Sequence, residues 1–307
     1  MKVLVTGGAG FIGSHVADAL LANGHQVVAL DDLSSGRREN LPGKARLEVL
    51  DVRSKAVGEL FAREKFDAVM HLAAQIDVRR SVADPAFDAD VNVGGTLNLL
   101  EAARKHGTRR VVFSSTGGAI YGEQDVFPAT ESHPQRPLSP YGCAKAACEL
   151  YLGYYQAQYG LEYVALRYAN VYGPRQNPHG EAGVVAIFCE KLLAGAASTI
   201  YGDGLQTRDF VYVGDVARAN VLALESSVRG EAINIGTGVE TDIVTVYRHL
   251  AKAAGVDKPP AHAAGKPGEQ RRSVIDPAKA ARALRWTPQT ALAQGLAQTM
   301  EWFKQSA

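Results

Sequence analysis

The chain has 307 residues, of which 46% are hydrophobic and 21% are charged, a composition that is typical of a globular protein. The formal net charge is only +1, so we expect neither nucleic acid nor a membrane surface as a partner. No apolar run is long enough to span a membrane, and the first residues resemble a strand and not a signal peptide.

The three cysteines, Cys143, Cys148 and Cys189, show neither a metal-binding nor a CxxC spacing. We therefore predict no metal site and no disulfide framework. Cys143 and Cys148 fall in one predicted helix, where small buried thiols are expected. This cysteine usage indicates a reducing compartment, so we expect a cytoplasmic protein.

Strands and helices are predicted to alternate over the first 168 residues. An apolar strand at 2–6, a glycine turn, an amphipathic helix at 11–22 and a strand at 26–30 form one βαβ unit. Further strands are predicted at 46–52, 67–74, 109–115 and 161–168, and further helices at 56–64, 91–105 and 140–158. This order predicts an α/β fold, a Rossmann-type doubly wound parallel sheet.

The pattern changes after Arg167, where a turn-rich segment, 172–182, precedes a predicted helix at 183–194. Short strands, one more helix and a sheet strand within 232–238 follow, before a tail of helices and a proline-rich stretch. We predict an NAD-binding domain over 1–172 with a returning segment at about 205–238. Residues 173–204 and 239–307 would form a smaller substrate-binding region over the carboxyl edge of the sheet.

A glycine-rich turn lies between the first strand and the first helix. Gly7, Gly10 and Gly13 are spaced GxxGxxG, and Phe11 and Ile12 begin the helix. Such a turn lets the backbone approach a pyrophosphate, and the helix N-terminus then faces the phosphates. The motif predicts a dinucleotide site.

Acidic and small residues at the following strand ends fit the same site. Asp31, at the end of the second strand, is expected to accept the ribose 2′-hydroxyl and to repel a 2′-phosphate, which favours NAD. Asp32 either shares this role or caps the turn. Asp51 and Val52 are expected near the adenine, and the small residues of Leu72-Ala73-Ala74 would let the cofactor lie close.

A tyrosine and a lysine share one face of a predicted helix. Ser139 and Pro140 favour a helix start, and Tyr141 and Lys145 are four residues apart. A lysine ammonium near a phenol lowers the phenol pKa, so the pair could serve as a base near neutral pH. Ser115 and Thr116 supply hydroxyl groups from the end of the preceding strand.

These residues resemble the extended short-chain dehydrogenase/reductase superfamily. TGGAGFIGSH, the YxxxK at Tyr141 and Lys145, LRYANVYGPRQ and YGDGLQTRDFVYVGDVA are its motifs in order, so the resemblance covers almost the whole chain. Within the superfamily the chain is most similar to the UDP-galactose (UDP-glucose) 4-epimerases. The resemblance implies an isomerase that oxidises the sugar transiently at C4 and returns hydride to the opposite face.

The resemblance also implies site residues. Tyr141 would remove the proton of the sugar 4-hydroxyl, Thr116 would hydrogen-bond the reacting oxygen, and Lys145 would hold the nicotinamide ribose. Cofactor contacts would also come from Asn92, Ser114 and Tyr168, and substrate contacts from Ser115, Asn170, Gly183, Val184, Tyr201, Arg208, Lys266 and Glu269.

Two substrate positions depart from the family motif RxGD, because Lys266 replaces its arginine and Glu269 its aspartate. A lysine keeps the charge but not the bidentate fork of arginine. Ser273 matches a position where a large aromatic can crowd the C2 substituent of the sugar. A serine there leaves room for an N-acetyl group, so we expect activity on UDP-N-acetylglucosamine as well.

Gly117 and Gly118 follow Thr116 where related dehydratases and decarboxylases carry acids. Dehydration needs a general acid and a base, and glycine supplies neither, so the pair favours epimerisation. Two alternatives remain open: a UDP-glucuronate or UDP-pentose 4-epimerase, and a non-catalytic NAD-binding sensor. The family implies a homodimer through a four-helix bundle that contains the helix from about Val91 and the Tyr141/Lys145 helix.

Overall fold

The computed structural model describes residues 1–179, 183–265 and 270–306. Its centre is a parallel seven-stranded sheet with strand order β10-β6-β5-β4-β1-β2-β3. The strands are β1 (Lys2–Thr6), β2 (Gln26–Asp31), β3 (Arg46–Val49), β4 (Ala68–His71), β5 (Arg110–Thr116), β6 (Glu162–Tyr168) and β10 (Glu231–Ile235). The predicted doubly wound α/β fold is confirmed.

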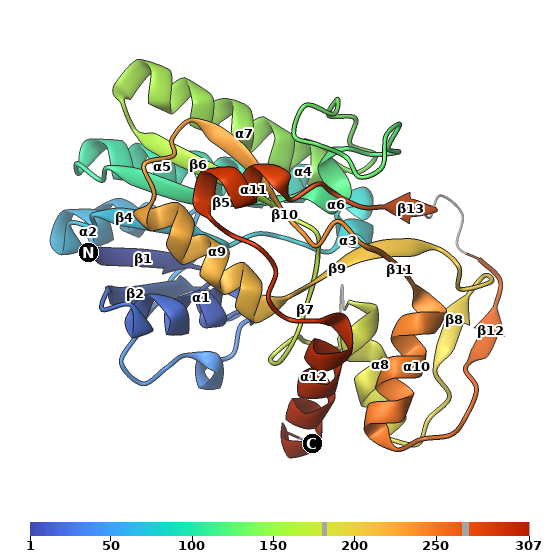
Figure 1. Ribbon diagram of the computed structural model, residues 1–307. Helices are drawn as coiled ribbons and strands as arrows, with labels where there is room; N and C mark the ends of the chain where they lie inside the picture. Colours follow the sequence, from blue (N-terminus) through green and yellow to red (C-terminus); the bar gives the residue numbers. More distant parts are fainter. Residues whose placement is uncertain (180–182, 266–269, 307) are drawn as a thin grey trace.

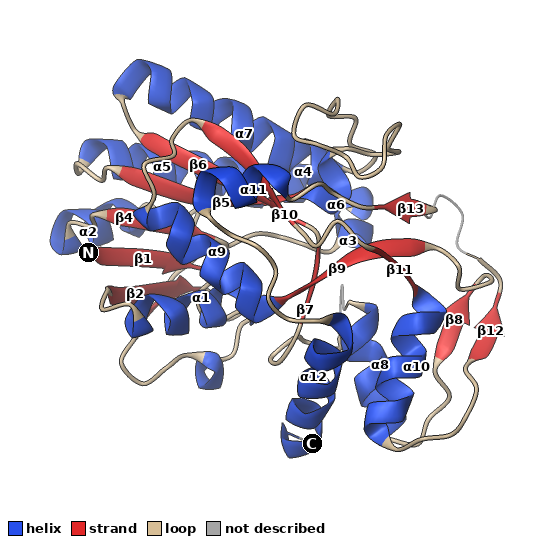
Figure 2. Cartoon of the chain, in the orientation of Figure 1, coloured by secondary structure: helices blue, strands red, loops and turns tan. Residues whose placement is uncertain are grey.

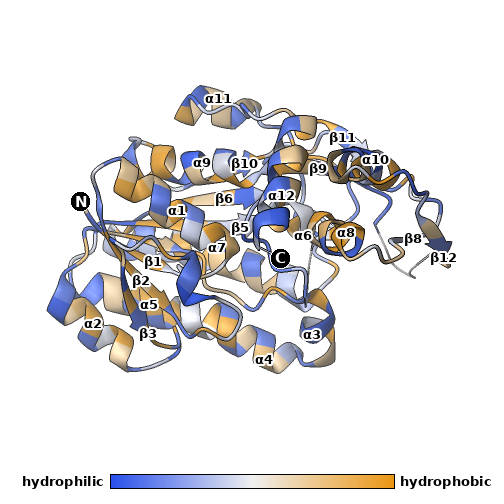
Figure 3. Ribbon diagram, turned by 90° about the horizontal axis from the view of Figure 1, so that it is seen from below, coloured by the Kyte–Doolittle hydropathy of each residue, from blue (hydrophilic) through white to orange (hydrophobic). Residues whose placement is uncertain are grey.

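Helices cover both faces of this sheet (Figures 2 and 3). One face carries α1 (Phe11–Ala22), α9 (Val213–Glu225) and α11 (Ala278–Leu284), and the other carries α2 (Ala56–Glu64), α5 (Gly95–Lys105) and α7 (Pro140–Tyr159). Successive strand residues alternate between the faces: Val3 and Val5 belong to the first core, and Leu4 to the second. Because both faces are buried, the strands are apolar almost throughout.

The chain reverses its direction of winding at β1. It runs from β1 through β2 to β3 at one edge, and then returns to place β4 on the other side of β1. Ligands of open α/β sheets bind at such a switch point, outside the carboxyl ends of the strands.

A smaller lobe lies beyond these carboxyl ends, on the right of Figure 1. It contains strands β7 (Asn170–Tyr172), β9 (Thr207–Tyr212), β11 (Glu240–Asp242) and β13 (Arg272–Ser273), and the pair β8 (Thr199–Tyr201) and β12 (Ala261–Ala263). Helices α8 (Val184–Leu193), α10 (Ile243–Ala254) and α12 (Leu292–Ser306) share a third core. The returning strand β10 pairs with β6 in the large sheet.

Several elements differ from the sequence prediction. β3 ends at Val49 and β4 at His71, so the residues expected at these strand ends lie in loops. The helix expected from Val91 opens with a π-helical turn, η2 (Asp90–Gly94), which follows α3 (Val78–Ala83) and α4 (Pro85–Ala89). The short helices η1 (Arg38–Asn40) and α6 (Gly117–Ile120) were not predicted.

The predicted buried state of the cysteines is only partly correct. Cys148 and Cys189 are buried, whereas Cys143 is exposed on α7. In the described part of the chain, no helix is long and apolar enough to cross a membrane.

Candidate active site

The glycine turn after β1 is held in one conformation by close packing. Gly7 has a φ of +66°, and its amide donates to Leu30 O at 2.8 Å. A Cβ at Gly7 would lie 2.8 Å from Ala73 N, and one at Gly13 would lie 2.0 Å from Gly7 O. Only glycine fits these two positions, since the backbone of the turn contacts both α1 and the loop after β4.

The N-terminus of α1 fits an anionic group. Its N-cap residue is Gly10, no side chain caps the helix, and the first turn carries no acid. The first N–H groups of a helix have no partner within the helix, and the helix dipole favours negative charge there. The backbone at Phe11 and Ile12 therefore forms a site that suits the diphosphate of a dinucleotide.

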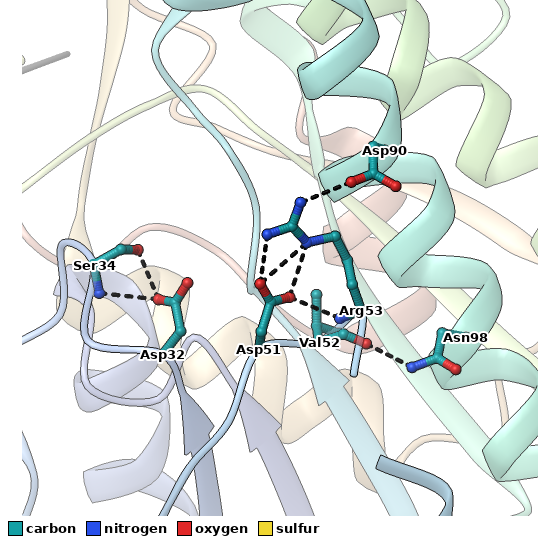
Figure 4. A network of polar contacts seen from close by, with 7 residues as sticks. All are labelled: Asp32, Ser34, Asp51, Val52, Arg53, Asp90 and Asn98. Atoms are coloured by element: carbon teal, nitrogen blue, oxygen red, sulfur yellow. Dashed lines mark hydrogen bonds and ion pairs between the residues drawn. The ribbon is translucent and has the colours of Figure 1, made fainter. Parts of the chain in front are cut away.

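Two aspartates follow one another at the end of β2. Asp31 is buried and accepts hydrogen bonds from Ala9 N and Leu33 N, each at 2.9 Å. Burial raises the pKa of the Asp31 carboxyl, whereas the hydrogen bonds from Leu33 and Ala9 lower it by less. Asp32 is exposed and accepts from Ser34 N at 3.0 Å and Ser34 Oγ at 2.6 Å (Figure 4). Asp31 thus ties the glycine turn to the strand end, while Asp32 faces solvent.

The loop after β3 presents a third carboxylate, that of Asp51, at the same edge (Figure 4). The Asp51 carboxylate accepts from Arg53 Nε at 3.0 Å and Nη2 at 2.6 Å. These bonds hold the pKa of Asp51 below its ordinary value. Val52 is buried, and its carbonyl accepts from Asn98 Nδ2 of α5 at 2.8 Å.

The loop after β4 is fixed to β1 through hydroxyl bonds. The amides of Leu72 and Ala73 donate to Thr6 Oγ1 at 3.2 and 3.1 Å, and this oxygen lies 2.7 Å from His71 Nδ1. Burial lowers the pKa of His71 to about 3, so the ring stays neutral. Ala74 continues the loop at intermediate exposure.

Asn92 is placed differently from the prediction that it contacts the cofactor. Its amide hydrogens go to Gln75 O at 3.0 Å and Asp88 Oδ1 at 3.1 Å, and its oxygen accepts from Gln75 N at 2.9 Å. The side chain is buried. Asn92 therefore fixes the loop after β4 against η2 and has no free donor for a ligand.

Helix α7 places Tyr141 and Lys145 beside the end of β5. Ser139 Oγ accepts from Gly142 N at 3.1 Å at the start of the helix. The Lys145 ammonium donates to Ser114 O at 2.8 Å and lies 5.9 Å from the centre of the Tyr141 ring. Desolvation lowers the pKa of Lys145 to about 8, so the group stays mostly protonated at pH 7.

Thr116 ends β5 and caps the short helix α6, where its Oγ1 accepts from Ala119 N at 3.2 Å. A Cβ at Gly142 of α7 would lie 2.9 Å from Ala119 O. The start of α7 therefore packs directly on α6. The structure in this way brings Thr116, Tyr141 and Lys145 together at the carboxyl end of β5.

The two glycines after Thr116 have different surroundings. A Cβ at Gly117 would lie 2.8 Å from Ile275 Cδ1, whereas a Cβ at Gly118 would have nothing closer than 3.9 Å. The two atoms at that distance from Gly118 are Thr116 Oγ1 and Asn170 Oδ1. Asn170 therefore faces the same space as Thr116.

Ser115 was predicted to contact substrate, and the structure corrects this. Its side chain is buried and donates to Glu149 Oε1 at 2.6 Å. The physical reason is the alternation of a strand, which directs Ser115 and Thr116 to opposite faces. Glu149 also accepts from Arg167 Nε at 3.0 Å and Nη2 at 2.6 Å.

Sequence reasoning missed this buried Glu149–Arg167 pair beneath the site. A signal was available, because Glu149 lies four residues after Lys145, on the same face of the helix. Tyr168, predicted to contact the cofactor, is likewise buried in β6. Its hydroxyl donates to Asn220 Oδ1 of α9 at 3.0 Å, and burial raises its pKa.

The predicted substrate residues of the smaller lobe lie on different elements. Arg208 stands in β9, in register with Thr241 of β11 and Ser273 of β13. Gly183 is the N-cap of α8, which begins at Val184 without a side-chain cap, and Tyr201 is 42% exposed on β8. Lys266 and Glu269 lie outside the described residues.

Within residues 1–179, 183–265 and 270–306, no group of three His, Cys, Asp or Glu side chains could hold a metal ion. The arrangement instead combines an anion-binding helix terminus, acids at the ends of β2 and β3, and a tyrosine–lysine pair. This set fits a dinucleotide with its reactive end near Tyr141.

Comparisons with known proteins agree with this geometry. The family model described as "NAD dependent epimerase/dehydratase family" matches residues 3–236. The UDP-glucose 4-epimerase of Mycolicibacterium smegmatis is 49% identical over 309 residues, 99% of this chain and 99% of that protein.

Two solved structures align over the full chain. The UDP-glucose 4-epimerase of Thermotoga maritima with UDP-glucose has a TM-score of 0.97 and 48% identity, over 100% of this chain and 99% of that chain. The UDP-glucose 4-epimerase of Thermus thermophilus in complex with NAD has a TM-score of 0.94 and 48% identity, over 100% of both chains. The chain belongs to the NAD-dependent epimerase/dehydratase family.

Proposed function

We propose that the protein is an NAD-dependent 4-epimerase of UDP-hexoses that interconverts UDP-galactose and UDP-glucose. The observation that carries this proposal is the meeting of Thr116, Tyr141 and Lys145 at the end of β5, with glycine at 117 and 118. Oxidation and reduction at one carbon need a hydroxyl acid–base and a hydride carrier, and no further acid. The relatives named above support the substrate class.

The protein residues handle the proton of the sugar 4-hydroxyl. Tyr141 removes this proton when C4 is oxidised and returns it when the ketone is reduced. The Lys145 ammonium stabilises the phenolate of Tyr141, and Thr116 Oγ1 hydrogen-bonds the reacting oxygen. Bound NAD supplies the acceptor and donor of hydride. Epimerisation results when the sugar turns over between the two transfers.

The cofactor is proposed to lie across the carboxyl ends of β1, β2 and β4. The α1 terminus binds the diphosphate, Asp31 and Asp32 face the adenosine ribose, and Asp51 accepts from the 6-amino group of adenine. The other proposed contacts are Gly7, Gly10, Phe11, Ile12, Gly13, Val52, Leu72, Ala73, Ala74 and Ser114. Asn92 and Tyr168 act indirectly, by positioning the loop after β4 and strand β6.

The UDP-sugar is proposed to bind between the sheet and the smaller lobe. Arg208 holds the diphosphate, since a guanidinium fork matches phosphate oxygens. Asn170, Gly183, Val184 and Tyr201 complete the pocket. Lys266 and Glu269, which lie outside the described residues, keep the substrate contacts that the family resemblance implies. Ser273 is small, which supports acceptance of the N-acetyl sugars.

The domain division is part of the proposal. Residues 1–172 with the return at about 205–238 form the NAD-binding domain, and 173–204 and 239–307 the sugar-binding region. Strands β7 and β9 fall within the first set of ranges, although they pair with each other in the sheet of the smaller lobe. One segment of the tail is better assigned to the first domain. Ala280 and Leu284 of α11 and the buried Trp286 belong to the core of the large sheet.

A homodimer is proposed through α7 and its neighbouring helix α5. Cys143, Leu150 and Tyr154 are exposed on one face of α7, with Leu150 76% and Tyr154 50% exposed. Their spacing of seven and four residues forms an apolar stripe, which a second copy would cover. A Leu150→Glu substitution should convert the dimer to a monomer in light scattering.

Free cysteines support a cytoplasmic location.

The decisive experiment follows UDP-glucose formation from UDP-galactose, with and without added NAD. We expect product, and a Tyr141→Phe variant should lose roughly 10²–10⁴-fold in rate while retaining NAD. Tyr159→Phe, at the exposed end of the same helix, is the matched control and should keep full activity.

Failure on UDP-galactose with turnover of UDP-glucuronate or a UDP-pentose would move the assignment to those epimerases. If the protein is folded and binds NAD but turns over none of these sugars, the result would favour the alternative of a non-catalytic NAD-binding sensor.

A further inference from the structure

Arg53 makes an unusually complete set of contacts to one carboxylate. Its backbone amide donates to Asp51 Oδ1 at 2.8 Å, its Nε lies 3.0 and 3.1 Å from Oδ1 and Oδ2, and its Nη2 donates to Oδ2 at 2.6 Å. Both side chains are 34% exposed. An exposed ion pair of this kind contributes little to stability, so its geometry is better explained by a role in positioning.

The other end of the guanidinium is anchored to a different element. Arg53 Nη1 donates to Asp90 of η2 at 2.7 Å (Figure 4), and its Cζ lies 5.5 Å from the centre of the Phe87 ring of α4. The arginine thus joins the loop after β3 to the helical segment that follows β4. Its fork cannot turn away from Asp51 without losing Asp90.

The residue between them is locked as well. A Cβ at Gly95 of α5 would lie 2.6 Å from Val52 Cγ1, and the Val52 carbonyl accepts from Asn98 at 2.8 Å. The backbone between Asp51 and Arg53 is therefore held against α5. The partly exposed Asp51 carboxylate projects from this fixed segment.

Among the described residues only Arg53 donates to the Asp51 carboxylate, which leaves one acceptor position open for a ligand. The contacts from Arg53 involve three N–H groups, since Nε–H is shared between both oxygens, and a carboxylate has about four acceptor sites. An ionised carboxylate only accepts hydrogen bonds. It therefore matches the 6-amino group of adenine and opposes the 6-carbonyl group of hypoxanthine.

We infer that Arg53 is a positioning residue that orients Asp51 toward the adenine edge and thereby sets the preference for adenine over a 6-oxo purine in the dinucleotide. This inference rests on the proposed function, in which Asp51 accepts from the adenine amino group. Asp90 supports the same orientation from the far end of the guanidinium.

The test is a competition between NAD and nicotinamide hypoxanthine dinucleotide, its 6-oxo analogue. The full-length protein, loaded beforehand with one dinucleotide or the other, is equilibrated with equal concentrations of both. Unbound dinucleotide is then removed. The bound dinucleotides are released and quantified by chromatography. The bound ratio reports discrimination independently of turnover and of a uniform loss in affinity.

Wild-type protein is expected to bind NAD about tenfold more than the analogue, as for other base-edge hydrogen bonds. Arg53→Met should lower this ratio to about twofold, and Asp51→Asn should bring it near one, because an amide can also donate. Arg63→Met is the matched control, since Arg63 pairs with Glu48 and Glu64 away from the site. It should keep the wild-type ratio.

Two results would separate the claims. A wild-type ratio near one, or an unchanged ratio in Asp51→Asn, contradicts the adenine role of Asp51 and with it the inference. Loss of discrimination in Asp51→Asn with a wild-type ratio in Arg53→Met overturns the inference alone. If Arg53→Met does not fold, Asp90→Asn replaces it: a ratio of about fivefold supports the inference, and a wild-type ratio overturns it.

Discussion

Replacing Lys145 with methionine is expected to stabilise the cofactor-free chain at pH 7 while abolishing turnover. The Lys145 side chain is 3% exposed and its ammonium donates to Ser114 O at 2.8 Å. Burial of a charge is costly unless it is well paired. Methionine has a similar length and no charge, so it removes this cost together with the catalytic function.

The magnitude follows from the pKa of Lys145, which desolvation lowers from 10.5 to about 8. One pKa unit corresponds to about 1.4 kcal/mol, so the charged form costs roughly 3 kcal/mol at pH 7. The lost hydrogen bond to Ser114 O offsets about 1.5 kcal/mol of this. Lys145→Met should therefore raise the free energy of unfolding by roughly 2 kcal/mol.

The sign of the pH dependence provides an internal check. Between pH 8 and 10.5 the unfolded chain still binds a proton at Lys145 that the folded chain has released. Raising the pH through this window therefore stabilises wild-type protein relative to Lys145→Met. Above it the charge cost is gone, and wild-type protein becomes the more stable one by its hydrogen bond.

The measurement is urea unfolding of both proteins, stripped of dinucleotide, from pH 7 to pH 10.5, with the difference in unfolding free energy plotted against pH. Taking the difference between the two proteins cancels the contribution of all other titrating groups to the pH dependence of the unfolding free energy. A variant less stable than wild-type protein at pH 7, or a difference that stays constant over this range, would refute the reasoning.

Three further changes probe other parts of the site. Gly117→Ala should cost about 1–2 kcal/mol in urea unfolding, since its Cβ would lie 2.8 Å from Ile275 Cδ1, whereas Gly118→Ala should leave the stability nearly unchanged. Glu149→Gln should cost about 3 kcal/mol by leaving Arg167 buried without a full counter-charge; unchanged stability would show that the pair is dispensable. Arg208→Met should raise the KM for UDP-galactose about tenfold or more with unaltered NAD content; an equal fall in NAD content would indicate instead a general disturbance.

Local sequence signals predicted most of the large sheet. The strands are near-continuous apolar runs, and helix α7 begins at Pro140 after the Ser139 cap, as its composition indicates. The glycine turn was equally readable, because the tight approach of Gly13 to Gly7 O depends on residues within one turn and one helix. Such features depend on neighbours a few residues apart.

Contacts between distant segments escaped the same reasoning. Ser115 was grouped with Thr116 although strand alternation separates them, and its partner Glu149 is 34 residues away. The Asn92 side chain is hydrogen-bonded to Gln75. The Arg53 side chain is hydrogen-bonded to Asp90, which lies 37 residues further along the chain. Cys143 is exposed because the described chain leaves this face of α7 uncovered.

The sequence by itself determined the order of strands and helices, the turn that suits a diphosphate, and the tyrosine–lysine face of α7, since these depend on periodicity and backbone sterics within short segments. Only the tertiary structure decided which polar groups remain available to ligands. That outcome depends on which distant residues satisfy each buried donor and acceptor. Packing depends on distant residues as well, since Ile275, 158 positions after Gly117, packs against it and closes one face of the site.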